Sequence, residues 1–97
     1  MKLYGLKACD TCRKARQSLE KEGENVEFVD VRETPLGPDL IAEFLDEFGE
    51  SLVNKRSTTW RELSDSARSL PPEQIITQNP TVMKRPVIRS ETHLTLG

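Results

Sequence analysis

The start of the chain constrains the fold most, because two apolar segments flank an uninterrupted helical stretch. Residues 1–6 are short and largely apolar, and residues 26–31 are rich in β-branched and aromatic side chains, so both are predicted to be strands. Residues 11–22 contain no glycine or proline, and their apolar side chains recur at helical spacing. A strand, a helix and a strand in this order predict a parallel pair of strands joined by a right-handed crossover.

The rest of the chain predicts a helical region followed by two further strands. The expected elements are a helix over residues 38–48, short helical turns within 50–70, a helix starting at Pro71, and strands starting at Arg85 and Thr92. The last two strands are expected to pair as an antiparallel hairpin. We therefore predict an α/β fold with one four-stranded mixed sheet and flanking helices, formed by residues 1–97 as a single domain.

The composition limits the classes of function. Fourteen lysines and arginines stand against sixteen aspartates and glutamates, which gives a net charge of −2. That balance argues against direct binding of nucleic acid or of a membrane surface. The N-terminus lacks the apolar core of a signal peptide, and no apolar run reaches the roughly 18 residues of a membrane span. We therefore expect a cytoplasmic protein.

Cys9 and Cys12 are the only cysteines, and they lie in the predicted turn between the first strand and the first helix. A structural disulfide fits poorly in the reducing cytoplasm. A metal site needs about two further ligands, and the single histidine, His93, is distant in sequence and expected on the surface of the hairpin. Two inert core cysteines remain an alternative. The C-x-x-C spacing and the position favour a redox-active or redox-sensing pair.

The position of Cys9 directly before a helix favours its thiolate. The unpaired amides and the positive end of the helix dipole stabilise an anion there. Lys7 and Arg13 add positive charge, whereas Asp10 opposes it. Cys12, one turn further into the helix and more covered, is expected to close on Cys9 as a resolving thiol.

Two placements follow from residue type alone. Asp10 or Thr11 is expected to cap the first helix, because both side chains can accept a hydrogen bond from a free helix amide. Trp60 is expected to anchor a core in preference to binding a ligand, because a large aromatic side chain is highly buried on average.

Four segments carry a resemblance to a known family. They are LYGLKACDTCRKA at residues 3–15, NKRSTTWREL at 54–63, MKRPV at 83–87 and LTLG at 94–97. With these segments the chain resembles the ArsC-like branch of the thioredoxin-fold superfamily, which contains arsenate reductases, Spx-type transcription regulators and YffB-type proteins. TTWREL is closest to the YffB type, whereas Cys12 and KRS at residues 55–57 are more similar to Spx. The resemblance implies a thioredoxin-like (glutaredoxin-like) sheet with an ArsC-type helical insertion.

The resemblance also implies roles for several side chains. Cys9 matches the nucleophilic cysteine, Arg85 an arginine that holds an oxyanion or thiolate, and Pro86 a cis-proline beside the site.

The match departs from the arsenate reductases of this type, which use three arginines around the cysteine. Asn54 stands at the position of a second arginine, with Arg56 two residues away, and the third falls near Gly97. The family usually continues into a final helix after LTLG, so the chain is expected to be short by nature or to lack that helix.

Two functions follow from these residues. The first is a thiol oxidoreductase in which Cys9 attacks a disulfide, a glutathione mixed disulfide or an oxyanion, and Cys12 resolves the adduct. Arg85 stabilises the negative charge, glutathione is the expected co-substrate, and no bound cofactor or metal is expected. The substrate-binding candidates are Lys7, Arg13, Arg56 and Pro86.

The alternative is an Spx-like regulator. In that reading the cysteine pair senses redox state, and its disulfide alters binding to the C-terminal domain of the RNA polymerase α subunit. The intact C-x-x-C and the KRS segment favour it.

Overall fold

The computed structural model describes residues 1–96, and the chain divides into two compact units. The first comprises Met1–Thr34 and Arg85–Gly97, and the second, Pro35–Lys84, is inserted between the two pieces of the first. The sheet and the cysteine pair belong to the first unit, and the helical region belongs to the second.

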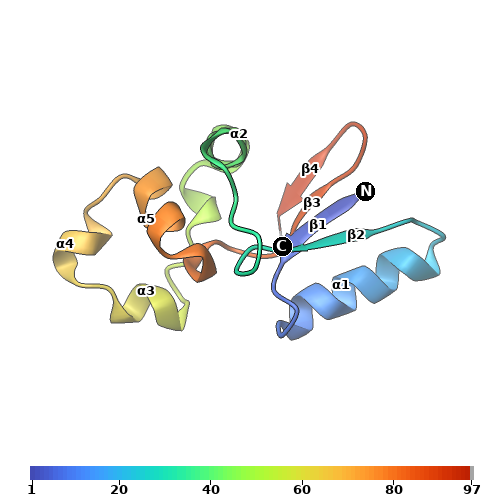
Figure 1. Ribbon diagram of the computed structural model, residues 1–97, viewed down its shortest axis with the longest axis horizontal. Coiled ribbons are helices and arrows are strands. Elements are labelled where there is room, and N and C mark those ends of the chain that lie inside the picture. The colour runs from blue at the N-terminus through green and yellow to red at the C-terminus, as the bar shows by residue number, and fades with distance from the viewer. Residues whose placement is uncertain (97) are drawn as a thin grey trace. The chain divides into compact units, whose positions relative to one another are not determined.

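The first unit opens with the predicted strand, helix and strand. β1 (Lys2–Gly5) and β2 (Glu27–Asp30) pair in parallel, with Leu3 opposite Phe28. The helix between them, α1 (Asp10–Lys21), starts one residue before the predicted position and lies alongside the strands (Figure 1). The parallel pair is therefore confirmed.

Two short strands from the end of the chain complete the sheet. β3 (Val87–Arg89) pairs antiparallel with both β1 and β4 (Leu94–Leu96), which gives the order β2-β1-β3-β4. The mixed four-stranded sheet and the terminal hairpin are therefore confirmed. Because Tyr4 lies opposite Val87, the chain leaves β1 at the same end of the sheet at which it enters β3.

The core of the first unit lies between α1 and the sheet. Leu3, Cys12 and Val26 are buried in one apolar cluster, and Ala15 and Leu19 of α1 pack against it. The helical stripe predicted from spacing thus faces the sheet. The position of Cys12 is fixed by this packing.

The second unit is helical, as predicted. Its elements are α2 (Pro38–Phe48), η1 (Gly49–Leu52), α3 (Thr58–Glu62), α4 (Asp65–Arg68), α5 (Pro72–Gln78) and η2 (Pro80–Val82). Pro38 and Pro72 open their helices, where a missing amide N–H costs nothing. A short antiparallel bridge between Val53 and Met83, which the sequence pattern did not indicate, joins two loops of this unit. Within residues 1–96, no helix combines the length and the apolar character that crossing a membrane requires.

Trp60 does not anchor the core, so that prediction was wrong. The indole is half-buried and lines a pocket of the second unit. The Nζ of Lys55 and the guanidinium carbon of Arg68 each lie 5.7 Å from the centroid of a Trp60 ring. The ring therefore lies beside two cations in a pocket wall and not in the apolar core.

Candidate active site

Cys9 is itself the N-terminal cap residue of α1. Its backbone is extended, with φ −86° and ψ 119°, and its amide N donates to the Leu6 carbonyl oxygen at 3.0 Å. The Cys9 carbonyl in turn accepts the Arg13 amide at 3.0 Å, which begins the helix. The prediction that Asp10 or Thr11 caps α1 was therefore wrong.

The carboxylate of Asp10 forms an ion pair within the first turn of the helix. Asp10 is the first residue of α1, and its carboxylate pairs with the guanidinium of Arg13 three residues later. That ion pair holds the carboxylate on the exposed side of the first turn, where neighbours three residues apart meet.

Asp30 fastens the turn that carries Cys9 to the end of β2. One oxygen of its carboxylate accepts the Lys7 amide at 2.9 Å, and the other accepts the amides of Arg32 at 2.8 Å and Glu33 at 3.1 Å. These hydrogen bonds, the Lys7 amide first, lower the pKa of Asp30. The turn after β1 is therefore also hydrogen-bonded to the end of β2. The sequence pattern did not indicate this role of Asp30.

Cys12 lies beneath Cys9 in the apolar core and is fully buried. Its sulfur approaches the backbone of Gly5 so closely that a Cβ at residue 5 would lie 2.5 Å from the Cys12 Sγ. Only a residue without a side chain fits there. Both cysteines are present as thiols.

The surroundings of Cys9 favour its ionised form. Burial raises the pKa of the Cys9 thiol, but the backbone amide and the thiol of Cys12 and the guanidinium of Arg85 outweigh it, so the pKa lies below its ordinary value. The Cys12 amide acts on the Cys9 sulfur from the first turn of α1, where free N–H groups favour an anion.

Cys12 is shifted in the opposite direction. Burial is the main cause, and the negative charge on Cys9 adds to it, so the pKa of Cys12 rises to about 11. The Leu6 backbone and Arg85 oppose this rise without cancelling it. The two thiols of the pair are therefore different acids, with Cys9 ionising first and Cys12 staying protonated near neutral pH.

Arg85 and Pro86 enter the site from the start of β3. The Arg85-Pro86 peptide bond is cis, as predicted, and Pro86 is fully buried. The Arg85 side chain reaches the Cys9 sulfur as a hydrogen-bond donor and as a positive charge. The sheet register brings Arg85 there, because β3 begins at the end of the sheet where β1 runs toward Cys9.

Lys7 and Arg13 lie on the same turn and helix as Cys9, but each has a carboxylate partner. The Lys7 Nζ donates to the Glu33 carboxylate at 2.9 Å, and Arg13 pairs with Asp10. Both cations are exposed, and the pKa of Cys9 is set mainly by burial, Cys12 and Arg85. Their assignment to substrate binding stays a prediction.

The remaining candidates lie elsewhere. Arg56 is an exposed residue of the second unit, and its amide donates to the Asn54 side-chain oxygen at 3.0 Å. Gly97 lies outside the described residues. His93 is exposed on the β3–β4 hairpin, as predicted. Within residues 1–96, no three His, Cys, Asp or Glu side chains gather to hold a metal ion.

The fold and the site define a thioredoxin-like protein with a cysteine at the start of its first helix and an arginine beside a cis-proline. The sequence profile of the ArsC family matches residues 4–97, and the chain belongs to that family. This confirms the predicted family and fold.

Relatives and solved structures agree with that assignment. An uncharacterized protein of Haemophilus influenzae is 33% identical, covering 98% of this chain and 88% of the relative. The global transcriptional regulator Spx of Listeria innocua is also 33% identical, covering 98% and 77%.

Among solved structures, a YFFB protein superposes with a TM-score of 0.91 at 28% identity, covering 99% of this chain and 89% of that one. An arsenate reductase (ArsC) related protein from Brucella melitensis superposes with a TM-score of 0.78 at 33% identity, covering 99% and 84%.

Proposed function

We propose that this chain is a thiol-disulfide oxidoreductase in which Cys9 is the nucleophile and Cys12 the resolving thiol. The observation that carries the proposal is the opposite displacement of the two pKa values, lowered for Cys9 and raised to about 11 for Cys12. The thiolate is the reactive form of cysteine. At neutral pH the pair thus offers one nucleophilic sulfur and, one turn behind it, one protonated sulfur.

The proposed first step is thiol-disulfide exchange with a glutathione mixed disulfide. The Cys9 thiolate attacks the glutathionyl sulfur, the substrate sulfur leaves as a thiolate and takes a proton from water, and a Cys9–glutathione disulfide forms. The guanidinium of Arg85, which already acts on the Cys9 sulfur, stabilises the negative charge that passes through the exchange.

Resolution then uses Cys12. Its sulfur attacks the Cys9 sulfur, its proton passes to the departing glutathione thiolate, and a Cys9–Cys12 disulfide forms. Two further glutathione molecules supply two electrons, leave as one glutathione disulfide and return both cysteines to thiols. The high pKa of Cys12 keeps it protonated in the reduced pair, so Cys9 is the sulfur that attacks the substrate.

Substrate binding is assigned first to two exposed cations of the first unit. Lys7 and Arg13 are exposed cations next to Cys9 in sequence, and their carboxylate partners are exposed side chains that solvent screens. Glutathione carries carboxylates that such cations bind. We assign Arg56 and Pro86 to the same role on the family resemblance. We propose a cytoplasmic location, where glutathione is abundant and reduced.

Intact-mass measurement tests this function. Reduced protein is incubated separately with oxidised glutathione and with arsenate. With oxidised glutathione we expect wild type to gain one glutathionyl group and then to release it as glutathione, which leaves a protein two hydrogens lighter than the reduced form. Cys12→Ser is expected to stop at the adduct. Cys9→Ser is expected to stay unmodified. Equal modification of Cys9→Ser and wild type would overturn the assignment of the nucleophile.

A second candidate is a redox-sensing regulator, supported by the similarity to Spx over nearly the whole chain. In that case the Cys9–Cys12 disulfide changes binding to the C-terminal domain of the RNA polymerase α subunit. A pull-down with purified polymerase, with and without reductant, separates the two. Reductant-dependent retention supports the regulator, and no retention together with turnover of a mixed disulfide supports the enzyme.

A further inference from the structure

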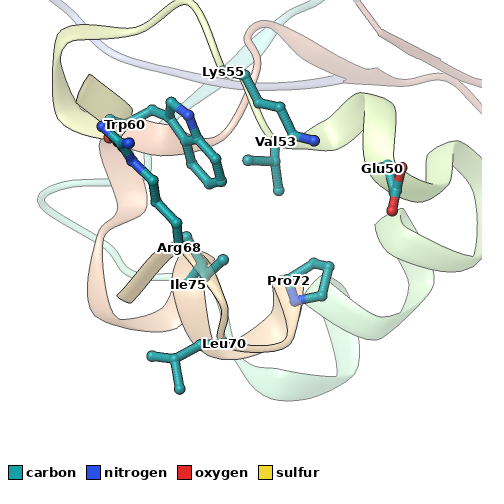
Figure 2. A pocket seen from close by; sticks show the side chains of 8 residues that line it. All are labelled: Glu50, Val53, Lys55, Trp60, Arg68, Leu70, Pro72 and Ile75. Atoms are coloured by element: carbon teal, nitrogen blue, oxygen red, sulfur yellow. Dashed lines mark hydrogen bonds between the residues drawn. The ribbon is translucent and has the colours of Figure 1, made fainter. Parts of the chain in front are cut away.

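The second unit contains a pocket that the cysteine chemistry does not use. Its volume is about 140 Å³, and it opens to solvent. The lining residues are Glu50, Val53, Lys55, Trp60, Arg68, Leu70, Pro72 and Ile75. Figure 2 shows these side chains around the opening, with Trp60 and Glu50 on opposite sides. A cavity of about 150 Å³ holds a six-membered hydrocarbon ring, so the pocket suits a small organic molecule.

Arg68 holds the aromatic wall of this pocket in place. Its Nε donates to the Trp60 carbonyl oxygen at 3.2 Å and an Nη donates to the Arg61 carbonyl oxygen at 2.9 Å. Its guanidinium carbon lies 5.7 Å from the centroid of the Trp60 ring, so the guanidinium also covers that ring. Two nitrogens of Arg68 therefore bind the backbone and the third lies 3.8 Å from the Asp65 carboxylate, so the guanidinium is held beside the indole before any ligand arrives.

Lys55 supplies the positive charge that can bind an anionic ligand in this pocket. Its Nζ lies 5.7 Å from the centroid of the Trp60 ring, and within residues 1–96 it takes part in none of the ion pairs. Figure 2 shows its ammonium group reaching over the pocket, with the indole between it and Arg68. An ammonium group held above an aromatic and aliphatic surface suits an anion with an apolar body.

Glu50 limits the charge of that anion. Two cations and one carboxylate line the pocket, so the lining carries one net positive charge. Glu50 would repel a multiply charged phosphate more strongly than a single carboxylate placed at Lys55. We propose that this pocket binds a small monocarboxylate with an apolar body, with the carboxylate at Lys55 and the apolar part against Trp60, Val53 and Ile75.

Trp60 is the only tryptophan of the chain, so its fluorescence reports on this pocket alone. The probe is cyclohexanecarboxylate, titrated at constant ionic strength, with cyclohexanecarboxamide as the neutral isostere and acetate as the charge without the apolar body. We expect a saturable change with the carboxylate in the millimolar range, which is usual for a ligand of this size. The carboxamide and acetate are expected to bind at least about threefold more weakly.

Three single substitutions locate the charge. Lys55→Gln is expected to weaken carboxylate binding about threefold to fivefold and to remove the preference for the carboxylate over the carboxamide. Glu50→Gln is expected to tighten carboxylate binding about twofold. Lys84 is an exposed lysine of the same unit that lies outside the pocket lining, and Lys84→Gln is expected to leave carboxylate binding unchanged. Shifts of the Trp60 indole N–H resonance give a second readout and confirm that each variant is folded. Equal affinity for carboxylate and carboxamide, equal losses for Lys55→Gln and Lys84→Gln, or no saturable change would overturn the proposal.

Discussion

The sulfur of Cys12 occupies the space that a side chain at Gly5 would need. A Cβ built on Gly5 would lie 2.5 Å from the Cys12 Sγ and 3.1 Å from the Cys12 Cβ. Real Cβ atoms do not approach a sulfur so closely, so either the strand or the helix must move to accept one. Gly5 on β1 and Cys12 on α1 therefore determine together how closely the helix packs on the sheet.

Replacing Gly5 with alanine is expected to destabilise the protein by about 1 to 3 kcal/mol through overpacking. In a Cys12→Ala background the same change should cost much less, because the new methyl group enters the space that the sulfur has left. Urea unfolding of the four variants under reducing conditions gives the coupling between the two positions. If Gly5→Ala costs the same in both backgrounds, the sulfur is not the obstacle.

The two thiols are expected to differ in reactivity across pH. Iodoacetamide labelling of Cys12→Ser, in which only Cys9 reacts, should show a midpoint below the ordinary cysteine pKa. Labelling of Cys9→Ser should show a midpoint above the ordinary cysteine pKa, because burial, the main cause of the raised Cys12 pKa, remains when Cys9 is replaced. Serine at position 12 keeps a hydrogen-bond donor beside Cys9. Faster reaction of Cys12 than of Cys9 below neutral pH would reverse the assigned roles.

Arg85→Met is expected to raise the pKa of Cys9 and to slow its labelling several-fold at neutral pH, because a hydrogen bond and a positive charge are lost together. Arg85→Lys should restore part of the effect. Lys14→Gln, which removes an exposed cation from α1, serves as the control and should leave the labelling midpoint in place. If Lys14→Gln shifted the labelling midpoint as much as Arg85→Met, the total charge of the unit would set the pKa of Cys9, and Arg85 would have no specific role.

Stability is expected to fall at alkaline pH because of Cys12. Its pKa rises from 9.0 when unfolded to about 11 when folded, so between these values the folded state binds more protons than the unfolded state. This contribution is complete below pH 9 and is lost progressively up to about pH 11, with a total of roughly 2 to 3 kcal/mol. The lowered pKa of Cys9 acts with the opposite sign and offsets part of it.

Unfolding curves between pH 8 and pH 11 under reducing conditions measure this effect as the difference between wild type and Cys12→Ser. Lysine and tyrosine titrations are common to both proteins and cancel. Parallel curves for the two proteins would contradict a raised Cys12 pKa.

Arsenate is expected to be a poor substrate. Among the described residues Arg85 is the one cation that lowers the Cys9 pKa, and Asn54 at the second family position is neutral. Charged hydrogen bonds contribute roughly 1.5 to 3 kcal/mol each. The absence of the second and third family arginines would therefore lower arsenate turnover on the order of a hundredfold or more. A coupled glutathione–glutaredoxin assay with arsenate, run beside a mixed disulfide, checks this. Efficient arsenate turnover that Cys9→Ser abolishes would contradict it.

The sequence predicted those features that depend on local patterning. The periodicity of residues 1–31 and the hairpin after Arg85 were sufficient for the sheet, because apolar spacing decides which face each element buries. The redox role of Cys9 and Cys12 was predicted from their spacing and their position before a helix, and the roles of Arg85 and Pro86 were predicted from resemblance to the family.

Features that depend on contacts between distant segments were missed. Nothing in the sequence pattern indicates that Gly5 makes room for a sulfur, or that Asp30 binds the turn after β1. The error on the helix cap arose because Asp10 pairs with Arg13 in place of the free amides. Trp60 was misplaced because its partners are the cations Lys55 and Arg68, which a burial scale does not count.

Because the second unit is inserted between Cys9 and Arg85 in the sequence, these two residues of the site are synthesised at different times. During synthesis Cys9 emerges early, whereas Arg85 and the strand that positions it follow only after the whole of Pro35–Lys84. Until β3 has taken its place beside β1, Cys9 lacks the guanidinium that helps to ionise it. The nascent chain therefore carries a thiol that is less reactive toward the cellular disulfide pool, and the thiol becomes fully acidic only when the last strands have joined the sheet.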